Sequence, residues 1–381
     1  MPPLAGLRVL DLSRLLPGPF ATMILADLGA EVVKVEDPRG GDYLRIMPLS
    51  APGRPNVVFE ALNRGKKSVV LDLKKPEGRD ALLALVAEAD VLLESFRPGV
   101  MERLGLGWDV LHAANPRLVA CALTGYGADG PLRDRAGHDL NYLARAGVLG
   151  MSGPPDAPPQ VPGVQVADMS GGLYAVIAIL AALQGRGQDG EGRQLDVGLC
   201  ESSLSMGLFG LGLAAGGSHL GRGADILTGG IAPYGTYATK DGGHVALAAL
   251  EPKFWMAFCA GVGLTPSLED VRPGPHQDAR RAELAAIFAE RTRDEWAAFG
   301  AEHDCCLEPV LRPDEVPLDP QHAARAVFAE RTLGDASFVM PRTPVAPPAE
   351  GPGPGQGADT DEVLEAAGVD VAALRAAGAT R

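Results

Sequence analysis

A strand–helix–strand pattern opens the chain at Leu7–Glu36, which reads LRVLDLSRLLPGPFATMILADLGAEVVKVE. The mostly apolar residues 7–12 fit a buried strand, a Pro-Gly-Pro turn leads into a helix over Phe20–Leu28, and Glu31–Glu36 fits a second strand. A βαβ unit of this kind predicts a parallel sheet flanked by helices. The loop after the first strand contains no G-x-G-x-x-G, so we do not expect it to bind NAD.

Strands and helices continue to alternate along the first half of the chain. Further strands are expected at Lys67–Leu73, Asp90–Glu94, Leu118–Leu123 and Arg193–Val197, and helices at Gly78–Ala89, Val100–Ala113, Asp168–Gly187 and Glu201–Ala215. This alternation is typical of an α/β fold with a parallel sheet. The sequence therefore predicts one large α/β domain over residues 1–215.

Glycine-rich sequence at Gly216–Gly230 marks a domain boundary. Beyond it we expect hairpin strands at Tyr234–Ala238 and His244–Ala248 and helices at Lys253–Val262, Ala282–Glu290 and Arg293–His303. These elements predict a smaller α+β domain over residues 216–330. Residues 331–381 are expected to form an extended strap that is rich in Pro and Gly and ends in a helix near Thr360–Ala377.

The composition limits the classes of partner. With 381 residues, 46% hydrophobic and 22% charged, the chain is long and apolar enough to bury a substantial core. Its net charge of −14 argues against general binding to nucleic acid or to a membrane surface. The apolar runs Leu173–Leu183 and Leu204–Ala215 are too short or too often broken by glycine to suggest a membrane span. Five cysteines without CxxC spacing, and an N-terminus unlike a signal peptide, predict reduced thiols in a cytoplasmic protein.

One segment of this acidic chain is locally basic. Between Ala61 and Asp80, six lysines and arginines stand against three acidic residues. A phosphate-binding edge and a solvated turn on either side of a strand both explain this pattern. The composition alone leaves both interpretations open.

The residues that suggest catalysis are His138 and Asp168. His138 follows a glycine, and Asp168 stands where a long apolar helix should begin, with Gly171 and Gly172 in its first turn. Free N–H groups at a helix N-terminus can stabilise an oxyanion, and glycines let a ligand approach the backbone. This arrangement predicts a carboxylate and an imidazole facing one carbon, beside an anion hole.

Each of these residues also has an ordinary structural explanation. Aspartate is a preferred N-cap, and a single histidine is commonly a packed or surface residue. His303 lies near Cys305 and Cys306, which on paper suggests a metal or a nucleophile. No second His or Cys pair stands at ligand spacing, so we predict no metal site.

Eight stretches, in this order, resemble the family III CoA-transferases of the CaiB/BaiF type, and within them the α-methylacyl-CoA racemase branch. They are the opening stretch Leu4–Glu36, DVLLESFRPGVMERLGLG at Asp90–Gly107, LTGYGADGP at Leu123–Pro131, AGHDLNYLARAGVLG at Ala136–Gly150, ADMSGG at Ala167–Gly172, YGTYATKDGGHVALAALEPKFW at Tyr234–Trp255, HDCCLEPVL at His303–Leu311 and TDEVL at Thr360–Leu364. The resemblance implies a Rossmann-like large domain to which the C-terminal strap returns, and a small α+β domain. It also implies two interlocked subunits, with the active site between the large domain of one and the small domain of the other.

The resemblance implies two alternative chemistries. In the racemases, residues matching His138 and Asp168 exchange the α-proton of a 2-methylacyl-CoA, and a residue matching Glu251 in Glu251-Pro252-Lys253-Phe254 supports the histidine. All three are present here, which favours a racemase that works by 1,1-proton transfer through an enolate. In the CoA-transferases, the residue matching Asp168 is instead a nucleophile that moves CoA between carboxylic acids. Asp139 is an alternative partner for the imidazole.

The resemblance also implies the residues that bind the CoA part of the substrate. They are Arg39, Leu71, Asp72, Leu73, Lys74, Ser95, Phe96, Arg97, Arg103, Gly137, Asp139, Leu140, Asn141 and Tyr142. Arg97 and Arg103 suit phosphate groups because guanidinium binds them through two hydrogen bonds. A family arginine is matched here by Asp37, and Arg39 is the candidate to replace it. The resemblance implies no metal or redox cofactor, since CoA is part of the substrate.

Overall fold

The computed structural model describes residues 1–49, 56–218 and 221–381, which form two compact units. The first unit consists of Met1–Ala146, Val164–Met206 and Gln321–Arg381, and the second of Gly147–Gly163 and Gly207–Pro320. The division differs from the predicted boundaries at residues 215 and 330. The segment Gly147–Gly163 joins the second unit, where the guanidinium of Arg222 donates to the carbonyl oxygen of Pro154 at 3.1 Å.

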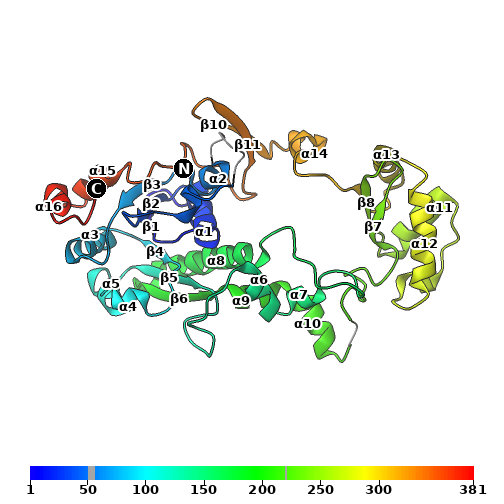
Figure 1. Ribbon diagram of the computed structural model, residues 1–381, viewed down its shortest axis with the longest axis horizontal. Coiled ribbons are helices and arrows are strands. Elements are labelled where there is room, and N and C mark those ends of the chain that lie inside the picture. The colour runs from blue at the N-terminus through cyan, green and yellow to red at the C-terminus, as the bar shows by residue number, and fades with distance from the viewer. Residues whose placement is uncertain (50–55, 219–220) are drawn as a thin grey trace. The chain divides into compact units, whose positions relative to one another are not determined.

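A six-stranded parallel sheet forms the centre of the first unit (Figure 1). Its strands are β1 (Arg8–Asp11), β2 (Glu31–Glu36), β3 (Lys67–Val70), β4 (Val91–Glu94), β5 (Val119–Thr124) and β6 (Arg193–Gly198). Their order is β3-β2-β1-β4-β5-β6, and every neighbouring pair is parallel. This is the Rossmann strand order, which reverses between β1 and β4, so the predicted α/β fold class is confirmed.

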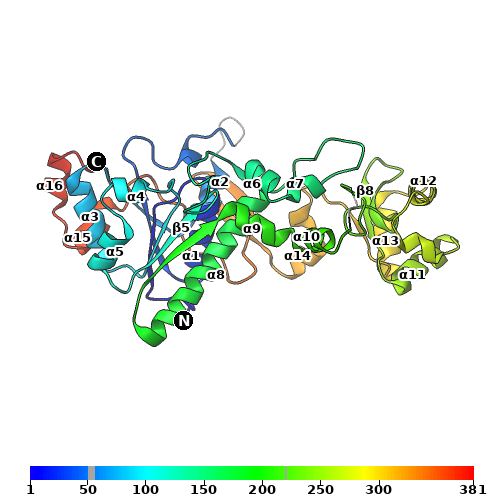
Figure 2. The ribbon, with the colours of Figure 1, turned by 90° about the horizontal axis from the view of Figure 1, so that it is seen from below.

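Helices cover both faces of this sheet (Figure 2). On one face, α3 (Pro76–Ala87) and α5 (Trp108–Ala114) share a hydrophobic core with α15 (Thr360–Ala366) and α16 (Val371–Ala376). On the other face, α1 (Pro17–Asp27) packs against β1 and β2, and α8 (Val166–Asp189) packs against β5 and β6. The remaining helices of this unit are α2 (Val57–Asn63), α4 (Val100–Arg103), α6 (Asp139–Arg145) and α9 (Leu199–Met206), together with the 3₁₀ helix η1 (Tyr43–Arg45).

Helix α8 extends beyond both ends of the helix that was predicted at Asp168–Gly187. Among the helices of the described residues, it alone is long and apolar enough by length and composition to cross a bilayer. The core helix of a globular protein meets the same criteria. In this structure 44% of its most apolar window is buried, and the helix packs against α1, α9 and β5.

The C-terminal segment contains a hairpin that the sequence analysis did not predict. Strands β10 (Phe328–Leu333) and β11 (Ala336–Pro341) pair antiparallel. The predicted single helix near Thr360–Ala377 is two helices, α15 and α16. This segment bonds to the edge of the sheet through Thr360, whose hydroxyl accepts from Val70 N at 3.2 Å, and through the carbonyl of Ala379, which accepts from Asp72 N at 2.8 Å.

The second unit is built on a small antiparallel sheet. Strands β7 (Tyr234–Ala238), β8 (His244–Ala248) and β9 (Leu307–Pro309) lie in this order. Helices α11 (Pro252–Val262), α12 (Gln277–Phe288) and α13 (Arg293–His303) surround an aromatic core that includes Phe258, Phe288 and Trp296. The predicted helix Glu201–Ala215 is divided at Gly207 into α9 and α10 (Leu208–Ala215). Helix α7 (Val148–Met151) and the 3₁₀ helices η2 (Leu268–Val271) and η3 (Val316–Leu318) also belong to this unit, and α14 (Pro320–Ala324) begins at its last residue and continues in the first unit.

Candidate active site

His138 stands at the N-cap position of α6, and its side chain is exposed. Two side chains from the same helix fix the turn that carries it. The Oδ1 atom of Asn141 accepts from the backbone N–H of His138 at 3.0 Å, and the hydroxyl of Tyr142 donates to the carbonyl of Gly137 at 2.7 Å. The imidazole is thus presented to solvent on a rigid turn.

Asp168 lies in the first turn of α8, but it does not cap this helix. The helix begins at Val166, and the capping acceptor is Asp139, the residue that follows His138. Its Oδ1 atom accepts from the backbone N–H groups of Ala167 at 2.7 Å and Asp168 at 3.1 Å. One carboxylate therefore joins the first turns of α6 and α8, which carry the two predicted acid/base residues.

The carboxyl of Asp168 has a strongly shifted pKa. Burial raises it to about 7, and the neighbouring Asp139 carboxylate adds to the rise. Both effects disfavour a negative charge on Asp168. The group is therefore able to hold or release a proton near neutral pH, as a general acid or base must.

Part of the predicted anion hole at the N-terminus of α8 is occupied by a side chain of the protein itself. Two of its N–H groups already donate to Asp139, and the two glycines serve packing instead of ligand access. A Cβ atom on Gly171 would lie 2.2 Å from the Leu199 side chain, and one on Gly172 would lie 2.8 Å from Phe20. Glycine at these positions lets α8 approach α9 and α1 closely.

A cavity of about 490 Å³ lies at the carboxyl ends of the strands, where the strand order reverses. Open α/β sheets bind ligands at this place. Six of the predicted CoA-binding residues line the cavity, namely Arg39, Leu71, Asp72, Leu73, Lys74 and Phe96. We call this the nucleotide cavity.

The sequence analysis missed Arg14 and Tyr43, which also line the nucleotide cavity. The guanidinium carbon of Arg14 lies 5.2 Å from the centre of the Tyr43 ring and 6.0 Å from that of Phe96. A planar cation between aromatic rings suits a nucleobase or a phosphate. The position of Arg14 directly after the first strand, at the carboxyl edge of the sheet, was the available signal.

Arg39 is held by acidic neighbours. Its Nη2 atom lies 3.2 Å from Asp37 Oδ2 and 4.0 Å from Asp72 Oδ1, and its side chain is largely exposed. The hydrogen bond to Asp37 raises the pKa of this guanidinium above its usual value. Arg39 thus lies at the cavity with part of its charge compensated.

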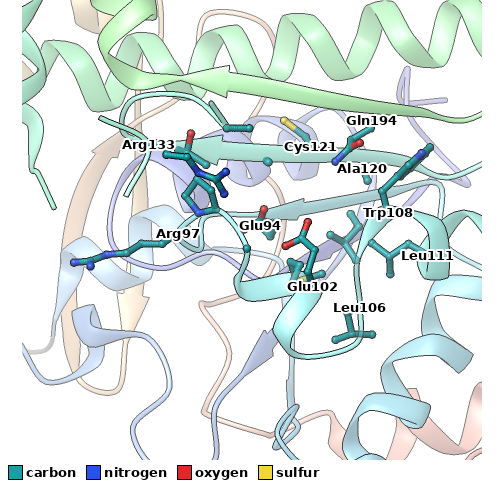
Figure 3. A pocket seen from close by; sticks show the side chains of 17 residues that line it. Glu94, Arg97, Glu102, Leu106, Trp108, Leu111, Ala120, Cys121, Arg133 and Gln194 are labelled. Atoms are coloured by element: carbon teal, nitrogen blue, oxygen red, sulfur yellow. The ribbon is translucent and has the colours of Figure 1, made fainter. Parts of the chain in front are cut away.

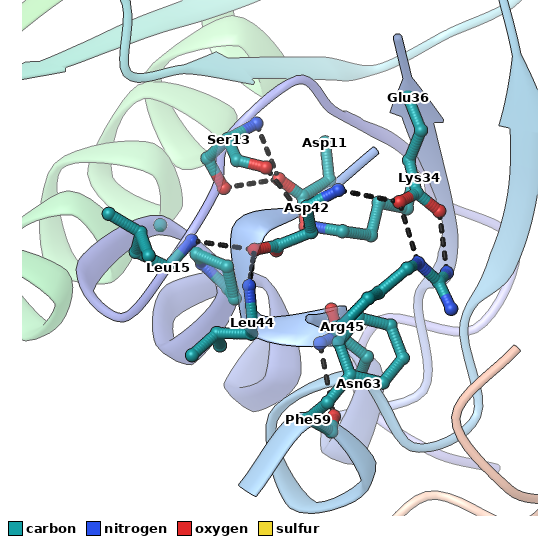
Figure 4. Close-up of polar contacts among 12 residues, drawn as sticks. Asp11, Ser13, Leu15, Lys34, Glu36, Asp42, Leu44, Arg45, Phe59 and Asn63 are labelled. Carbon is teal, nitrogen blue, oxygen red and sulfur yellow. Dashed lines mark hydrogen bonds and ion pairs between the residues drawn. The ribbon is translucent and has the colours of Figure 1, made fainter. Parts of the chain in front are cut away.

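A buried charge cluster holds the loop that carries Arg14 (Figure 4). The Oδ1 atom of Asp42 accepts from the backbone N–H groups of Leu15 and Leu44, each at 3.0 Å. Its Oδ2 atom lies 2.9 Å from Lys34 Nζ, and both side chains are fully buried. Leu15 has a φ of 63°, which a non-glycine residue rarely adopts without such support.

The basic segment between Ala61 and Asp80 is mainly structural. Arg64 Nη2 lies 2.6 Å from Asp27 Oδ2, and Lys66 Nζ lies 3.1 Å from Asp11 Oδ2, with both pairs buried. Both interpretations are therefore wrong for Arg64 and Lys66. These side chains are paired with carboxylates instead of lining a phosphate-binding edge, and they are buried instead of solvated. Of this segment's basic residues, Lys74 lines the nucleotide cavity.

The other predicted binding residues lie outside the nucleotide cavity. Arg97 lines a second cavity, of about 120 Å³, and Arg103 is the last residue of α4. The turn and first helical turn described above contain Gly137, Asp139, Leu140, Asn141 and Tyr142. Ser95 directly precedes Phe96 in the chain. The structure thus divides the predicted set among the nucleotide cavity, the β4–α4 segment with the second cavity, and the turn at the start of α6.

Glu251 belongs to the second unit, where it is the exposed N-cap residue of α11. Burial raises the pKa of Cys306, and the Glu251 carboxylate adds to this rise. His303 packs against Phe299, with ring centres 4.2 Å apart. Among the described residues, no three His, Cys, Asp or Glu side chains gather as metal ligands.

Comparisons with known proteins agree with this architecture. A model of CoA-transferase family III matches residues 4–360. The chain is 37% identical to an acyl-CoA transferase of Fusarium pseudograminearum, over 97% of this chain and 86% of that protein. It is 36% identical to alpha-methylacyl-CoA racemase of Homo sapiens, over 95% of this chain and 92% of that protein. A CAIB/BAIF family protein from Brucella suis superposes with a TM-score of 0.82 at 32% identity, covering 96% of this chain and 99% of that one.

Proposed function

This chain belongs to CoA-transferase family III, and we propose that it interconverts the two enantiomers of 2-methylacyl-CoA thioesters. The observation that carries this proposal is the Asp168 carboxyl, whose pKa burial raises to about 7. It lies in the first turn of a helix that Asp139 joins to the turn of His138. A histidine side chain and a carboxyl whose pKa is raised to about 7 can serve as the acid and the base in proton transfer at one carbon.

In the proposed reaction, one member of the pair removes the α-proton and the other returns a proton to the opposite face. The electrons of the broken C–H bond pass into an enolate of the thioester, and a new C–H bond forms with inverted configuration. His138 and Asp168 exchange roles when the reaction runs in the other direction. The scheme needs no redox cofactor, because no electrons leave the substrate, and none of its proton transfers requires a metal.

The nucleotide cavity is proposed to hold the CoA part of the substrate. Arg14, Arg39 and Lys74 supply positive charge at its wall, and Tyr43 and Phe96 supply aromatic surface. The chain carries a net charge of −14, so such local cations are needed to bind a polyphosphate. Identity of 36% to the human racemase over most of both chains supports the same substrate class.

We further propose that the active form is an interlocked homodimer. In this arrangement Glu251 of one subunit supports His138 of the other. The support is the presence of His138, Asp168 and Glu251 together in a chain that resembles the racemases, and the assignment of Glu251 to a separate compact unit.

The alternative function is CoA transfer between carboxylic acids, with Asp168 as nucleophile. Identity of 37% to an acyl-CoA transferase favours it. In that reaction the Asp168 carboxylate attacks the thioester carbonyl, the thiolate of CoA leaves, and an acyl-aspartyl anhydride forms. A carboxyl with a pKa near 7 is partly protonated at neutral pH, which suits an acid/base role better than a nucleophilic one.

Proton NMR in D₂O tests the two functions. The enzyme is mixed with one enantiomer of a 2-methylacyl-CoA and no acceptor acid. Loss of the α-proton signal together with loss of optical purity is the expected result. An unchanged substrate would overturn the racemase proposal, and formation of a new thioester after addition of an acceptor acid would then establish CoA transfer.

A further inference from the structure

The turn Ser95–Arg97, directly after β4, lies between two cavities. Phe96 lines the nucleotide cavity, and Arg97 lines the smaller cavity of about 120 Å³. Adjacent side chains of this turn therefore stand in the walls of both cavities.

Glu94, the last residue of β4, holds this turn from behind. Its Oε2 atom accepts from the backbone N–H of Phe96 at 2.6 Å. Figure 3 shows Glu94 and Glu102 at the smaller cavity, with Arg97 extending away from both. The proposed reaction and the nucleotide cavity make no use of this carboxyl.

The surroundings of Glu94 disfavour its charge. Apolar side chains such as Leu106 and Trp108 line the cavity, while Glu102 of α4 and Asp196 of β6 add negative charge. Burial, with smaller contributions from these two carboxylates, raises the pKa of Glu94 to about 7, and the bond from Phe96 N–H opposes the rise. The thiol of Cys121 and the guanidinium of Arg133 also line this cavity. Ionising a carboxyl in such a place costs free energy. The interaction that the structure shows for this carboxyl is the hydrogen bond that it accepts from the turn.

We propose that Glu94 is a positioning residue for CoA, which fixes the Ser95–Arg97 turn so that Phe96 faces the nucleotide cavity. This inference rests on the proposed function, in that the nucleotide cavity binds CoA. An ionised carboxylate accepts a hydrogen bond more strongly than a carboxyl or an amide does. Affinity for CoA therefore rises with pH through the range in which Glu94 ionises, and the Glu94→Gln variant loses this dependence.

Isothermal titration calorimetry with 3′-dephospho-CoA tests the proposal at pH 5.5 and pH 8.5. This probe lacks the 3′-phosphate, whose own ionisation would otherwise change over the same range. At pH 8.5 we expect Glu94→Gln to bind about fivefold more weakly than the wild type, since a neutral acceptor replaces a charged one. At pH 5.5 the two proteins should bind alike, and kcat at saturating substrate should stay within about twofold.

Glu102→Gln is the matched control, because it removes a carboxyl from the same cavity without touching the turn. It should bind the probe as the wild type does at pH 8.5. A second readout follows the amide of Phe96 in protein labelled with ¹⁵N-phenylalanine. Its signal should titrate with pH in the wild type and not in Glu94→Gln.

Three outcomes would overturn the inference. Equal affinity of Glu94→Gln and the wild type at pH 8.5 is the first, and a loss of kcat with affinity unchanged is the second. The third applies if Glu94→Gln does not fold: in that case the wild type alone is measured, and equal affinity for the probe at pH 5.5 and pH 8.5 would overturn the inference. A wild type that does not bind the probe at either pH would instead refute the proposed function, and with it this inference.

Discussion

The Oδ1 atom of Asp139 lies 3.1 Å from the backbone nitrogen of Asp168 and accepts its hydrogen. The bond crosses from α6 to α8 and joins residues 29 positions apart in the chain. Through it, one carboxylate caps the helix of Asp168 and also raises the pKa of the Asp168 carboxyl. Helix stability and proton affinity at the proposed site therefore depend on the same group.

Substitutions of Asp139 should separate these two effects. Asp139→Asn removes the charge and keeps an acceptor, while Asp139→Ala removes both. Both variants should lower the pKa of Asp168, so the midpoint of the pH–rate profile that this carboxyl controls should move to lower pH. Only Asp139→Ala should lose about 1 kcal/mol of unfolding free energy, measured in urea, because only it lacks a cap. Equal stability of the two variants would contradict the capping role.

Asp168→Asn should abolish proton exchange and change the pH dependence of stability. The folded-state pKa of about 7 lies above the ordinary aspartate pKa of 3.8, so the wild type loses stability as pH rises through this window. At pH 8.5 we expect the variant to be more stable than the wild type by about 2 kcal/mol, a figure discounted for partial exposure. At pH 3.5 the difference should vanish. Urea unfolding at both pH values measures it, and a variant that is less stable at pH 8.5 would contradict the buried-charge explanation.

The proposed dimer predicts complementation between inactive variants. Asp168→Asn and Glu251→Gln should each be nearly inactive as homodimers. In a heterodimer of the two, one active site carries both substitutions and the other carries neither, so activity should return to about half that of the wild type. The heterodimer can be isolated with two affinity tags. Activity no greater than that of the parent homodimers would refute the contribution of Glu251 from the partner subunit.

Arg14 should contribute to binding of the nucleotide without contributing much to stability. Arg14→Ala removes a cation from the nucleotide cavity and should weaken CoA binding about tenfold, as expected for loss of a charged contact. Arg133→Ala is the control, since Arg133 lines the smaller cavity. Calorimetric titration with CoA compares the two, and equal effects would indicate a general loss of positive charge instead of a specific contact.

The α/β class and the positions of most strands could be predicted from the amino-acid sequence alone. The strands β1, β2, β4, β5 and β6 were expected within two residues of their observed ends, since short apolar runs bounded by turns are local signals. The hairpin β7–β8 was predicted with its observed bounds for the same reason. The hairpin β10–β11 was missed because neither strand is a buried apolar run: its residues are half-buried or exposed.

The tertiary structure decided how the predicted site residues are used. The cap on α8 comes from Asp139, in another helix, so no local pattern around Asp168 could identify it. The cations Arg64 and Lys66 looked available in sequence, but their partners Asp27 and Asp11 are remote in the chain. A sequence gives residue types and local periodicity, whereas burial and charge pairing arise only when distant segments pack together. For this reason the identity of the candidate residues followed from the sequence, and their pKa shifts, hydrogen-bond partners and cavities followed from the fold.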